Sequence, residues 1–150
     1  MKPYFKFERD FVADLRCIPM TVRYKLDTCG VKLKLSHWHA FSQEIRQALV
    51  DKSCTTPEEI KAYREWLHRL VLEYTNAPAK DLPVEENPPW MDTTKIPDSV
   101  KDKAQQEKVK ITLEQWANLS TIQRFVLIKL SRPSHENKNF LPAIKEFNLG

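Results

Sequence analysis

A 36-residue segment occurs twice in this chain, and this repetition constrains the fold more than any other feature. Residues 18–53, moved forward by 78 positions, align without a gap on residues 96–131 and are identical at 12 of the 36 positions. Unrelated segments of ordinary composition would match at about two positions by chance. The pattern predicts an internal duplication. Two copies favour one pseudo-symmetric domain over residues 1–150, because a solenoid needs about three or more repeats.

Each copy contains the same sequence signals for helices. Both begin with Ile-Pro, and proline suits the first helical turn because its missing N–H would have no partner there. In the first copy we predict a helix over residues 19–29, with Gly30 as a left-handed C-terminal cap. Ser42 and Ser120 are predicted N-caps. The predicted fold class is therefore all-α, with a helix, a link, a short helix, a turn and a helix in each copy.

The rest of the chain predicts further helices and one proline-rich connection. Apolar spacing indicates a short helix over residues 5–16, and a capping box indicates a long helix over residues 56–74. Residues 76–97 hold half of the prolines and are predicted to be an extended linker. Trp90 in this linker either packs back onto the core or contacts a partner. A last helix is expected over residues 141–147.

Two repeated residues raise the question of DNA binding, since helix pairs joined by short turns also occur in DNA-binding regulators. Trp38 and Trp116 recur at one register beside leucine, which favours core packing over stacking on nucleobases. Arg46 and Arg124 also recur. We favour a role for these arginines inside the fold, on a carboxylate or a carbonyl, over a role in binding phosphate.

The net charge is +4, and much of it lies in one stretch. Residues 16–34 contain five basic residues against Asp27 alone, and we take all five as candidate partner-binding residues: Arg16, Arg23, Lys25, Lys32 and Lys34. Elsewhere the charges are mixed, as on a solvated surface. A nucleic-acid binder usually has a stronger basic stripe. An acidic protein surface and a phosphorylated cofactor stay open as alternatives for this patch.

The most polar stretch follows the second copy and has no counterpart after the first. Polar loops on a rigid scaffold often carry function, so we include seven of its residues as partner-binding candidates: Arg132, His135, Glu136, Asn137, Lys138, Asn139 and Phe140. A capped turn into the last helix is an equally good interpretation. The neighbours His135 and Glu136 leave a small hydrolase as a third, weaker hypothesis.

Most motifs of catalysis, cofactor binding and metal binding are missing. The chain has two glycines, so dinucleotide-binding and P-loop motifs are absent, and His37 and His39 would point to different sides of a helix. Cys17, Cys29 and Cys54 are predicted to be reduced and mostly buried. We expect no enzyme activity, no metal and no directly bound cofactor. Without an apolar run or a signal sequence, we expect a cytoplasmic protein that does not enter a membrane.

Three segments resemble a known family. Residues 15–20, 25–38 and 130–142 are similar to the nitrate reductase-associated protein family of oxygenic phototrophic bacteria. The resemblance implies a small cytoplasmic accessory protein that assimilatory nitrate reductase, an enzyme with a molybdenum cofactor and an iron–sulfur cluster, needs for activity. It supplies no catalytic residues.

Together these observations predict a non-catalytic accessory or maturation protein whose partner is assimilatory nitrate reductase. It would act by protein–protein contact: by holding the apo-enzyme open for cofactor insertion, by donating an assembly surface, or by remaining as a small subunit. The alternative is a helix-turn-helix regulator of nitrogen genes, although nucleic acid is not the expected partner. The oligomeric state is left open.

Overall fold

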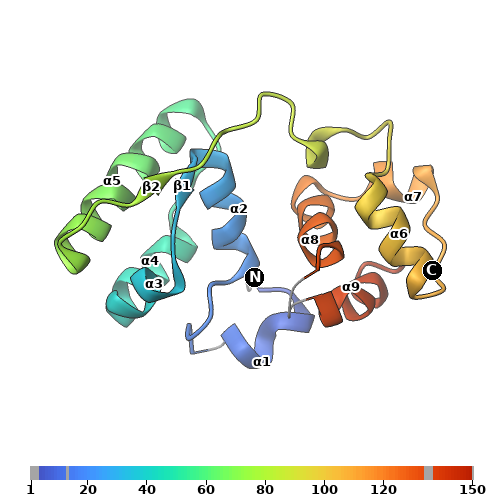
Figure 1. Cartoon of the computed structure of the whole chain (residues 1–150), viewed down its shortest axis with the longest axis horizontal. Helices are drawn as coiled ribbons and strands as arrows, with labels where there is room; N and C mark the ends of the chain where they lie inside the picture. Colours follow the sequence, from blue (N-terminus) through green and yellow to red (C-terminus); the bar gives the residue numbers. More distant parts are fainter. Residues whose placement is uncertain (1–3, 13, 134–136, 150) are drawn as a thin grey trace. The chain divides into compact units, whose positions relative to one another are not determined.

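The computed structural model describes residues 4–12, 14–133 and 137–149. The chain forms two compact units, Met1–Val84 (unit 1) and Glu85–Gly150 (unit 2), and both are mostly helical (Figure 1). The boundary between them falls inside the predicted linker, residues 76–97. The expectation of one domain over residues 1–150 stays a prediction.

Unit 1 packs its helices around one hydrophobic core and includes a small antiparallel sheet. Its elements are η1 (Lys6–Glu8), α1 (Arg9–Val12), α2 (Met20–Cys29), β1 (Val31–Lys32), α3 (Leu35–Ala40), α4 (Gln43–Asp51), α5 (Pro57–Thr75) and β2 (Lys80–Asp81). Helix α5 packs against α2, α3 and β1, and Figure 1 shows it alongside the strand pair.

The long helix α5 forms where its sequence signals place it. The Thr56 hydroxyl accepts a hydrogen bond from the Glu59 N–H at 3.2 Å, and the Glu59 carboxylate accepts one from the Thr56 N–H at 3.0 Å. Asn76 ends the helix in a left-handed conformation. Its buried stripe consists of Tyr63, Leu67, Leu70 and Val71. Burying each such side chain contributes roughly 1.5–3 kcal/mol.

The predicted helix over residues 5–16 is shorter in the structure and ends at Val12. Leu15 has a φ of +60°, which is incompatible with a continuing α-helix. Its carbonyl oxygen accepts hydrogen bonds from the Trp38 indole at 2.7 Å and the Arg46 guanidinium at 3.2 Å. The chain therefore turns at Leu15 to present this carbonyl to two distant side chains.

The expectation of a purely helical protein is wrong in one detail. In the antiparallel sheet, Val31 lies opposite Asp81 and Lys32 lies opposite Lys80. The Leu82 N–H also donates to the Gly30 carbonyl at 2.8 Å. The proline-rich segment cannot continue α5, and its extended backbone instead pairs with the link that follows α2.

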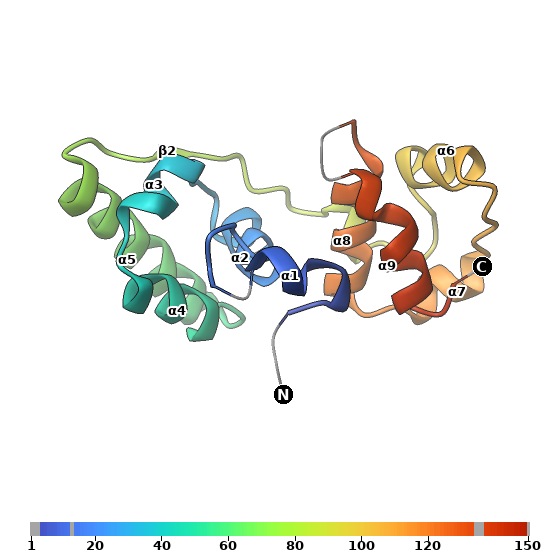
Figure 2. The same ribbon diagram turned by 90° about the horizontal axis from the view of Figure 1, so that it is seen from below.

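Unit 2 is organised around α8, which is buried on most of its sides. Its elements are η2 (Pro89–Met91), α6 (Asp98–Gln106), α7 (Leu113–Asn118), α8 (Thr121–Ser131), η3 (Asn137–Asn139) and α9 (Phe140–Glu146). Helices α6 and α9 and the turn η2 pack against α8, and Figure 2 shows α9 beside it. The buried side chains Phe125, Val126, Leu127, Ile128 and Leu130 all come from α8.

Corresponding helices of the two units begin at the same spacing. Helices α6, α7 and α8 start 78 residues after α2, α3 and α4. The predicted N-caps are confirmed, because the hydroxyls of Ser42 and Ser120 accept backbone N–H groups of the third helical residue, each at 3.2 Å. Gly30 is confirmed as the left-handed cap of α2, with φ +78°.

Candidate functional site

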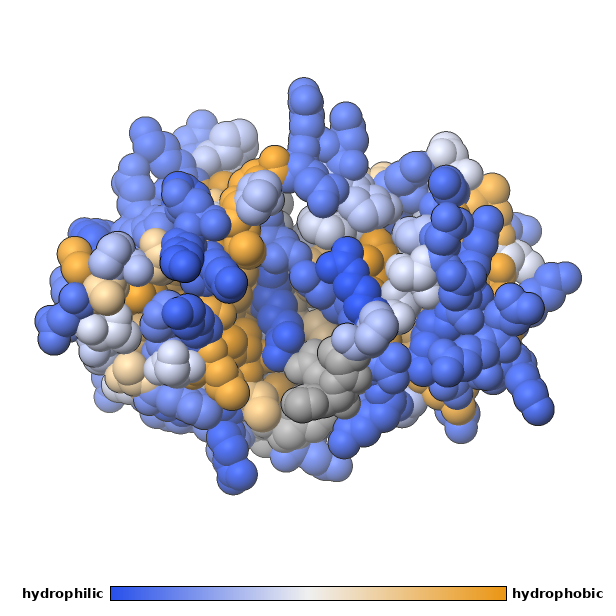
Figure 3. All heavy atoms as spheres, viewed as in Figure 1, coloured by the Kyte–Doolittle hydropathy of each residue, from blue (hydrophilic) through white to orange (hydrophobic). Residues whose placement is uncertain are grey.

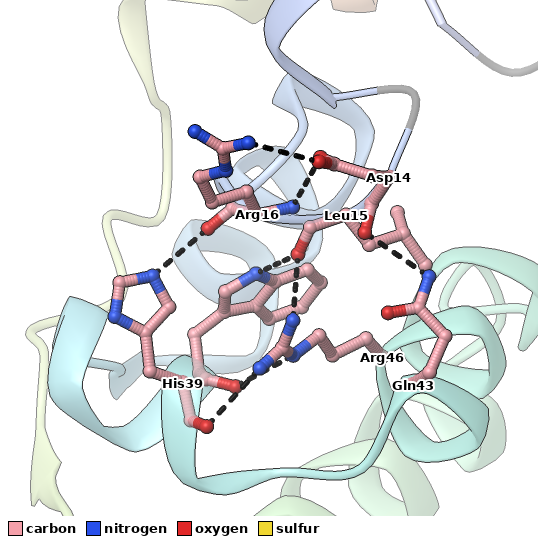
Figure 4. A network of polar contacts seen from close by, with 7 residues as sticks. Asp14, Leu15, Arg16, His39, Gln43 and Arg46 are labelled. Atoms are coloured by element: carbon pink, nitrogen blue, oxygen red, sulfur yellow. Dashed lines mark hydrogen bonds and ion pairs between the residues drawn. The ribbon is translucent and has the colours of Figure 1, made fainter.

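The repeated tryptophan and arginine of unit 1 serve the fold. Trp38 is fully buried. The Arg46 guanidinium donates to the carbonyls of Trp38 at 2.9 Å, Leu15 at 3.2 Å and His39 at 3.1 Å, as Figure 4 shows. It therefore joins two carbonyls near the C-terminal end of α3, where a cation is favoured, to the Leu15 carbonyl, which lies outside that helix. Both interpretations drawn from the repeat, a core tryptophan and an internal arginine, are confirmed here.

Unit 2 repeats this arrangement with a more deeply buried arginine. The Trp116 indole donates to the Asp92 carbonyl at 2.9 Å. Arg124 is 6% exposed and donates from Nε to the Trp90 carbonyl at 2.7 Å. Its Nη1 lies on three further carbonyls, those of Trp116, Ala117 and Leu119. Neither tryptophan presents a ring face for a nucleobase.

Two of the five basic residues predicted to contact a partner, Arg23 and Lys25, instead bind backbone carbonyls inside unit 1. The Lys25 ammonium donates to the carbonyls of Val50 at 2.6 Å and Lys52 at 2.8 Å, at the C-terminal end of α4. Burial lowers the pKa of Lys25 below its ordinary value. The Arg23 guanidinium is half-buried and donates to the Ile18 carbonyl at 3.2 Å. These contacts use both cations for internal carbonyls.

The other three predicted basic residues are exposed. Arg16 pairs with Asp14 at 3.3 Å, but the two side chains are 77% and 62% exposed, so the pair adds little stability. Figure 4 shows this pair above the Arg46 network. Lys32 on β1 and Lys34 before α3 are also exposed, and within the described residues no carboxylate pairs with their ammonium groups. On the face in Figure 3, polar residues cover most of the surface.

The polar stretch after α8 is only partly described, and His135 and Glu136 lie outside the described residues. The Asn137 side chain accepts a hydrogen bond at 3.3 Å from Lys103, which is 7% exposed. Phe140 is fully buried at the start of α9, and Asn139 is half-buried. Arg132 and Lys138 are exposed. In the described part of this stretch, Asn137 and Phe140 therefore make contacts inside unit 2, and Arg132 and Lys138 stay available to a partner.

Trp90 packs onto the core of unit 2. Its ring meets Phe125 edge-on, with centroids 5.1 Å apart, and its carbonyl accepts the Arg124 bond. The side chain is half-buried. Of the two alternatives raised by the sequence, packing back onto the core describes its position.

A buried polar cluster in unit 1 was not anticipated from the sequence. The Tyr63 hydroxyl donates to the Leu49 carbonyl at 2.8 Å, and the Lys25 ammonium donates to the same carbonyl at 3.4 Å. The free thiols of Cys29 and Cys54 are buried and interact. The interaction with Cys29 lowers the pKa of Cys54, and the positive charge of Lys25 lowers it further. The same interaction raises the pKa of Cys29. Only the burial of cysteines could be foreseen.

Tyr63 gives this cluster a measurable pH dependence. Burial raises the pKa of Tyr63, whereas an unfolded tyrosine ionises near 10. Above about pH 10 the unfolded chain releases this proton and the folded chain keeps it, so stability falls by about 1.4 kcal/mol per pH unit. We expect Tyr63→Phe to remove this part of the alkaline slope. Urea unfolding from pH 9 to 11.5 measures it, and an unchanged slope would contradict the expectation.

The described residues contain no cluster of three or more His, Cys, Asp or Glu side chains placed to hold a metal ion. None of the helices within those residues is long and apolar enough to span a membrane.

Fold and surface together define a small, mainly helical protein in which repeated tryptophan–arginine pairs stabilise the core and unpaired cations lie outside. The chain belongs to the family described as conserved nitrate reductase-associated protein, whose sequence model matches residues 4–147. The resemblance noted from three sequence segments is thereby confirmed. No curated protein and no solved structure is significantly similar to the chain.

Proposed function

We propose that this chain is a non-catalytic accessory protein that assimilatory nitrate reductase needs in order to become active. It acts in the cytoplasm by direct protein–protein contact, at the step where the molybdenum cofactor is inserted. The observation that carries this proposal is membership of a nitrate reductase-associated family over residues 4–147. The surface cations are suited to attract an acidic partner surface, because electrostatic complementarity steers association.

The distribution of charge supports a protein partner over DNA. In a helix-turn-helix protein the second helix of the pair enters the major groove. Here α8 is mostly buried, and α4 carries the exposed acidic residues Glu44 and Asp51. A DNA phosphate would meet like charge on α4, so these helices suit packing better than groove binding.

We also infer that residues 18–53 and 96–131 arose by duplication of one ancestral segment. The common 78-residue spacing of the helix starts supports this inference. So does the shared contact scheme, in which Arg46 and Arg124 both bind the carbonyl of the repeated tryptophan.

The decisive experiment compares cells with and without this chain. Nitrate reductase activity is measured together with the amount of enzyme protein and its molybdenum content. We expect lost activity, normal enzyme protein and low molybdenum. Low activity with normal molybdenum would place the action at another step, loss of the enzyme protein would favour gene regulation, and unchanged activity would contradict the accessory role.

The exposed lysines of unit 1 give a more local prediction. The double variant Lys32→Glu, Lys34→Glu should fold normally yet reduce nitrate reductase activation several-fold, because it reverses two exposed charges that have no internal partner. The control Lys61→Glu, Lys95→Glu makes the same change in net charge at other exposed positions. Activity in complemented cells is the measurement. Equal activation by both variants would remove Lys32 and Lys34 from the contact surface.

A further inference from the structure

The link between α6 and α7 in unit 2 has an open backbone edge. The equivalent link in unit 1, 78 residues earlier, is β1, and β2 covers it with main-chain hydrogen bonds. In unit 2 the Val109 N–H donates to Ala104 at 2.8 Å. The backbone N–H groups of Lys110 and Ile111 have no partner among the described residues. Unit 2 therefore lacks a strand where unit 1 has one.

A cavity of about 390 Å³ lies against this open edge. Its apolar lining includes Ile96, Ala104 and Val109, and its cationic lining consists of Lys101, Lys108 and Lys110. The three lysines are exposed, and within the described part of the chain no carboxylate pairs with them. The site thus offers main-chain donors, an apolar surface and three positive charges to one ligand.

We propose that this edge binds an extended, acidic peptide segment of a partner protein. The segment adds a short strand to Val109–Ile111, places an apolar side chain against Ile96 and Ala104, and sets its carboxylates near the lysines. Strand addition takes its affinity from main-chain hydrogen bonds and its specificity from side-chain pockets. We take nitrate reductase as the source of this segment, and only this part of the proposal rests on the accessory role.

Unit 1 contains an internal example of the main-chain pairing and of one bound carboxylate, although the two residues of β2, Lys80 and Asp81, carry no net charge together. Strand β2 is extended, and its Asp81 carboxylate accepts bonds from Arg64 at 2.8 Å and His68 at 3.0 Å. A segment held by main-chain pairing, with its one carboxylate bound by the Arg64 guanidinium, is therefore already part of this fold. In unit 2 a different set of cations, Lys101, Lys108 and Lys110, lies beside a link that no described strand covers.

One difference between the units limits the length of the bound strand. A Cβ at Gly30 would lie 2.5 Å from Val84 and 2.9 Å from the Leu82 carbonyl, so the β2 segment passes directly over that glycine. Lys108 occupies the equivalent position in unit 2, with φ +60°. Its side chain blocks the same path, so the bound segment must leave the edge at Lys108, where a carboxylate can meet the ammonium group.

Exposed lysines at a sheet edge can also serve to prevent unwanted strand pairing. A protective role and a binding role predict different results with an acidic peptide. Lysines that only prevent strand pairing would give no specific binding site, whereas a binding edge would bind the peptide at a defined place. A peptide-binding experiment separates them.

The probe is a fluorescein-labelled peptide, Glu-Val-Asp-Val-Glu-Val, titrated with the full chain and followed by fluorescence anisotropy. Its controls are Lys-Val-Lys-Val-Lys-Val and an acidic peptide N-methylated at alternate residues, which keeps the charges and removes main-chain donors. We expect the acidic peptide to bind at least about tenfold more tightly than either control. Amide NMR shifts should locate it at residues 109–111.

The double variant Lys108→Glu, Lys110→Glu should lose at least about tenfold in affinity. The double variant Lys61→Glu, Arg69→Glu, at exposed positions on α5 of unit 1, makes the same change in net charge and should bind like the unaltered chain. The edge site is overturned by absence of binding, by equal binding of the N-methylated peptide or by an unaffected double variant. Nitrate reductase takes no part in this assay. A negative result would therefore overturn the edge site alone, and the accessory role would still be tested by the measurement in cells.

Discussion

Replacing Arg124 by methionine should destabilise unit 2 by about 3–5 kcal/mol, since the buried carbonyls around it would lose a charged donor. The guanidinium binds the Trp90 carbonyl and three carbonyls at the end of α7, and only 6% of the residue is exposed. Methionine keeps much of the apolar stem, so the loss reports mainly on these hydrogen bonds. Urea unfolding, followed through tryptophan fluorescence, measures it.

Two further variants show whether burial sets the size of this effect. Arg46→Met removes the equivalent contacts in unit 1, but Arg46 is half-exposed, so water can replace part of them and the loss should be about 1–3 kcal/mol. Arg69→Met, at an exposed position on α5, should stay within about 0.5 kcal/mol of the unaltered chain. A loss at Arg124 no larger than at Arg69 would contradict the role assigned to the guanidinium.

The features foreseen from the sequence are those that local rules control. Ser42 and Ser120 were recognisable as N-caps because capping depends on residues three positions apart. Gly30 was recognisable because a left-handed cap favours glycine. The repeat itself marked Trp38 and Arg46, since a core tryptophan and its arginine recur at a fixed spacing.

The features that were missed depend on contacts between distant residues. The first helix stops at Val12, and Leu15 then presents its carbonyl to Trp38 and Arg46, contacts that no pattern within residues 5–16 reveals. The sequence does not separate Lys25 from the surface charges, because charge alone does not show which way a side chain points. Its ammonium instead binds the end of α4.

The candidate edge in unit 2 was missed for a related reason. Lys101, Lys108 and Lys110 do not form one dense basic run in the sequence, and the turn after α6 brings them to one cavity. The repeat held the needed signal. It aligns a link that β2 covers with one that no described strand covers, but the pairing of β1 with β2 had to be seen first.

That pairing leads to the second large effect, at Gly30. Gly30→Ala should destabilise unit 1 by about 2–4 kcal/mol, combining the left-handed strain of a Cβ with overpacking. The new Cβ would lie 2.5 Å from Val84 and 2.9 Å from the backbone oxygen of Leu82, and φ is +78°. Urea unfolding gives the loss. Faster amide exchange at Leu82, whose N–H donates to Gly30, would show that β2 detaches.

The equivalent residue of unit 2 provides the matched control, because the two positions share a backbone conformation and differ in what covers them. Lys108→Gly relieves the strain of φ +60° but makes the unfolded chain more flexible, so its net effect should stay within about 1 kcal/mol. Combining Gly30→Ala with Val84→Ala should recover only part of the loss, since the Leu82 oxygen remains. A neutral Gly30→Ala would mean that β2 does not lie against the link, which would remove the structural precedent for strand addition at Val109–Ile111.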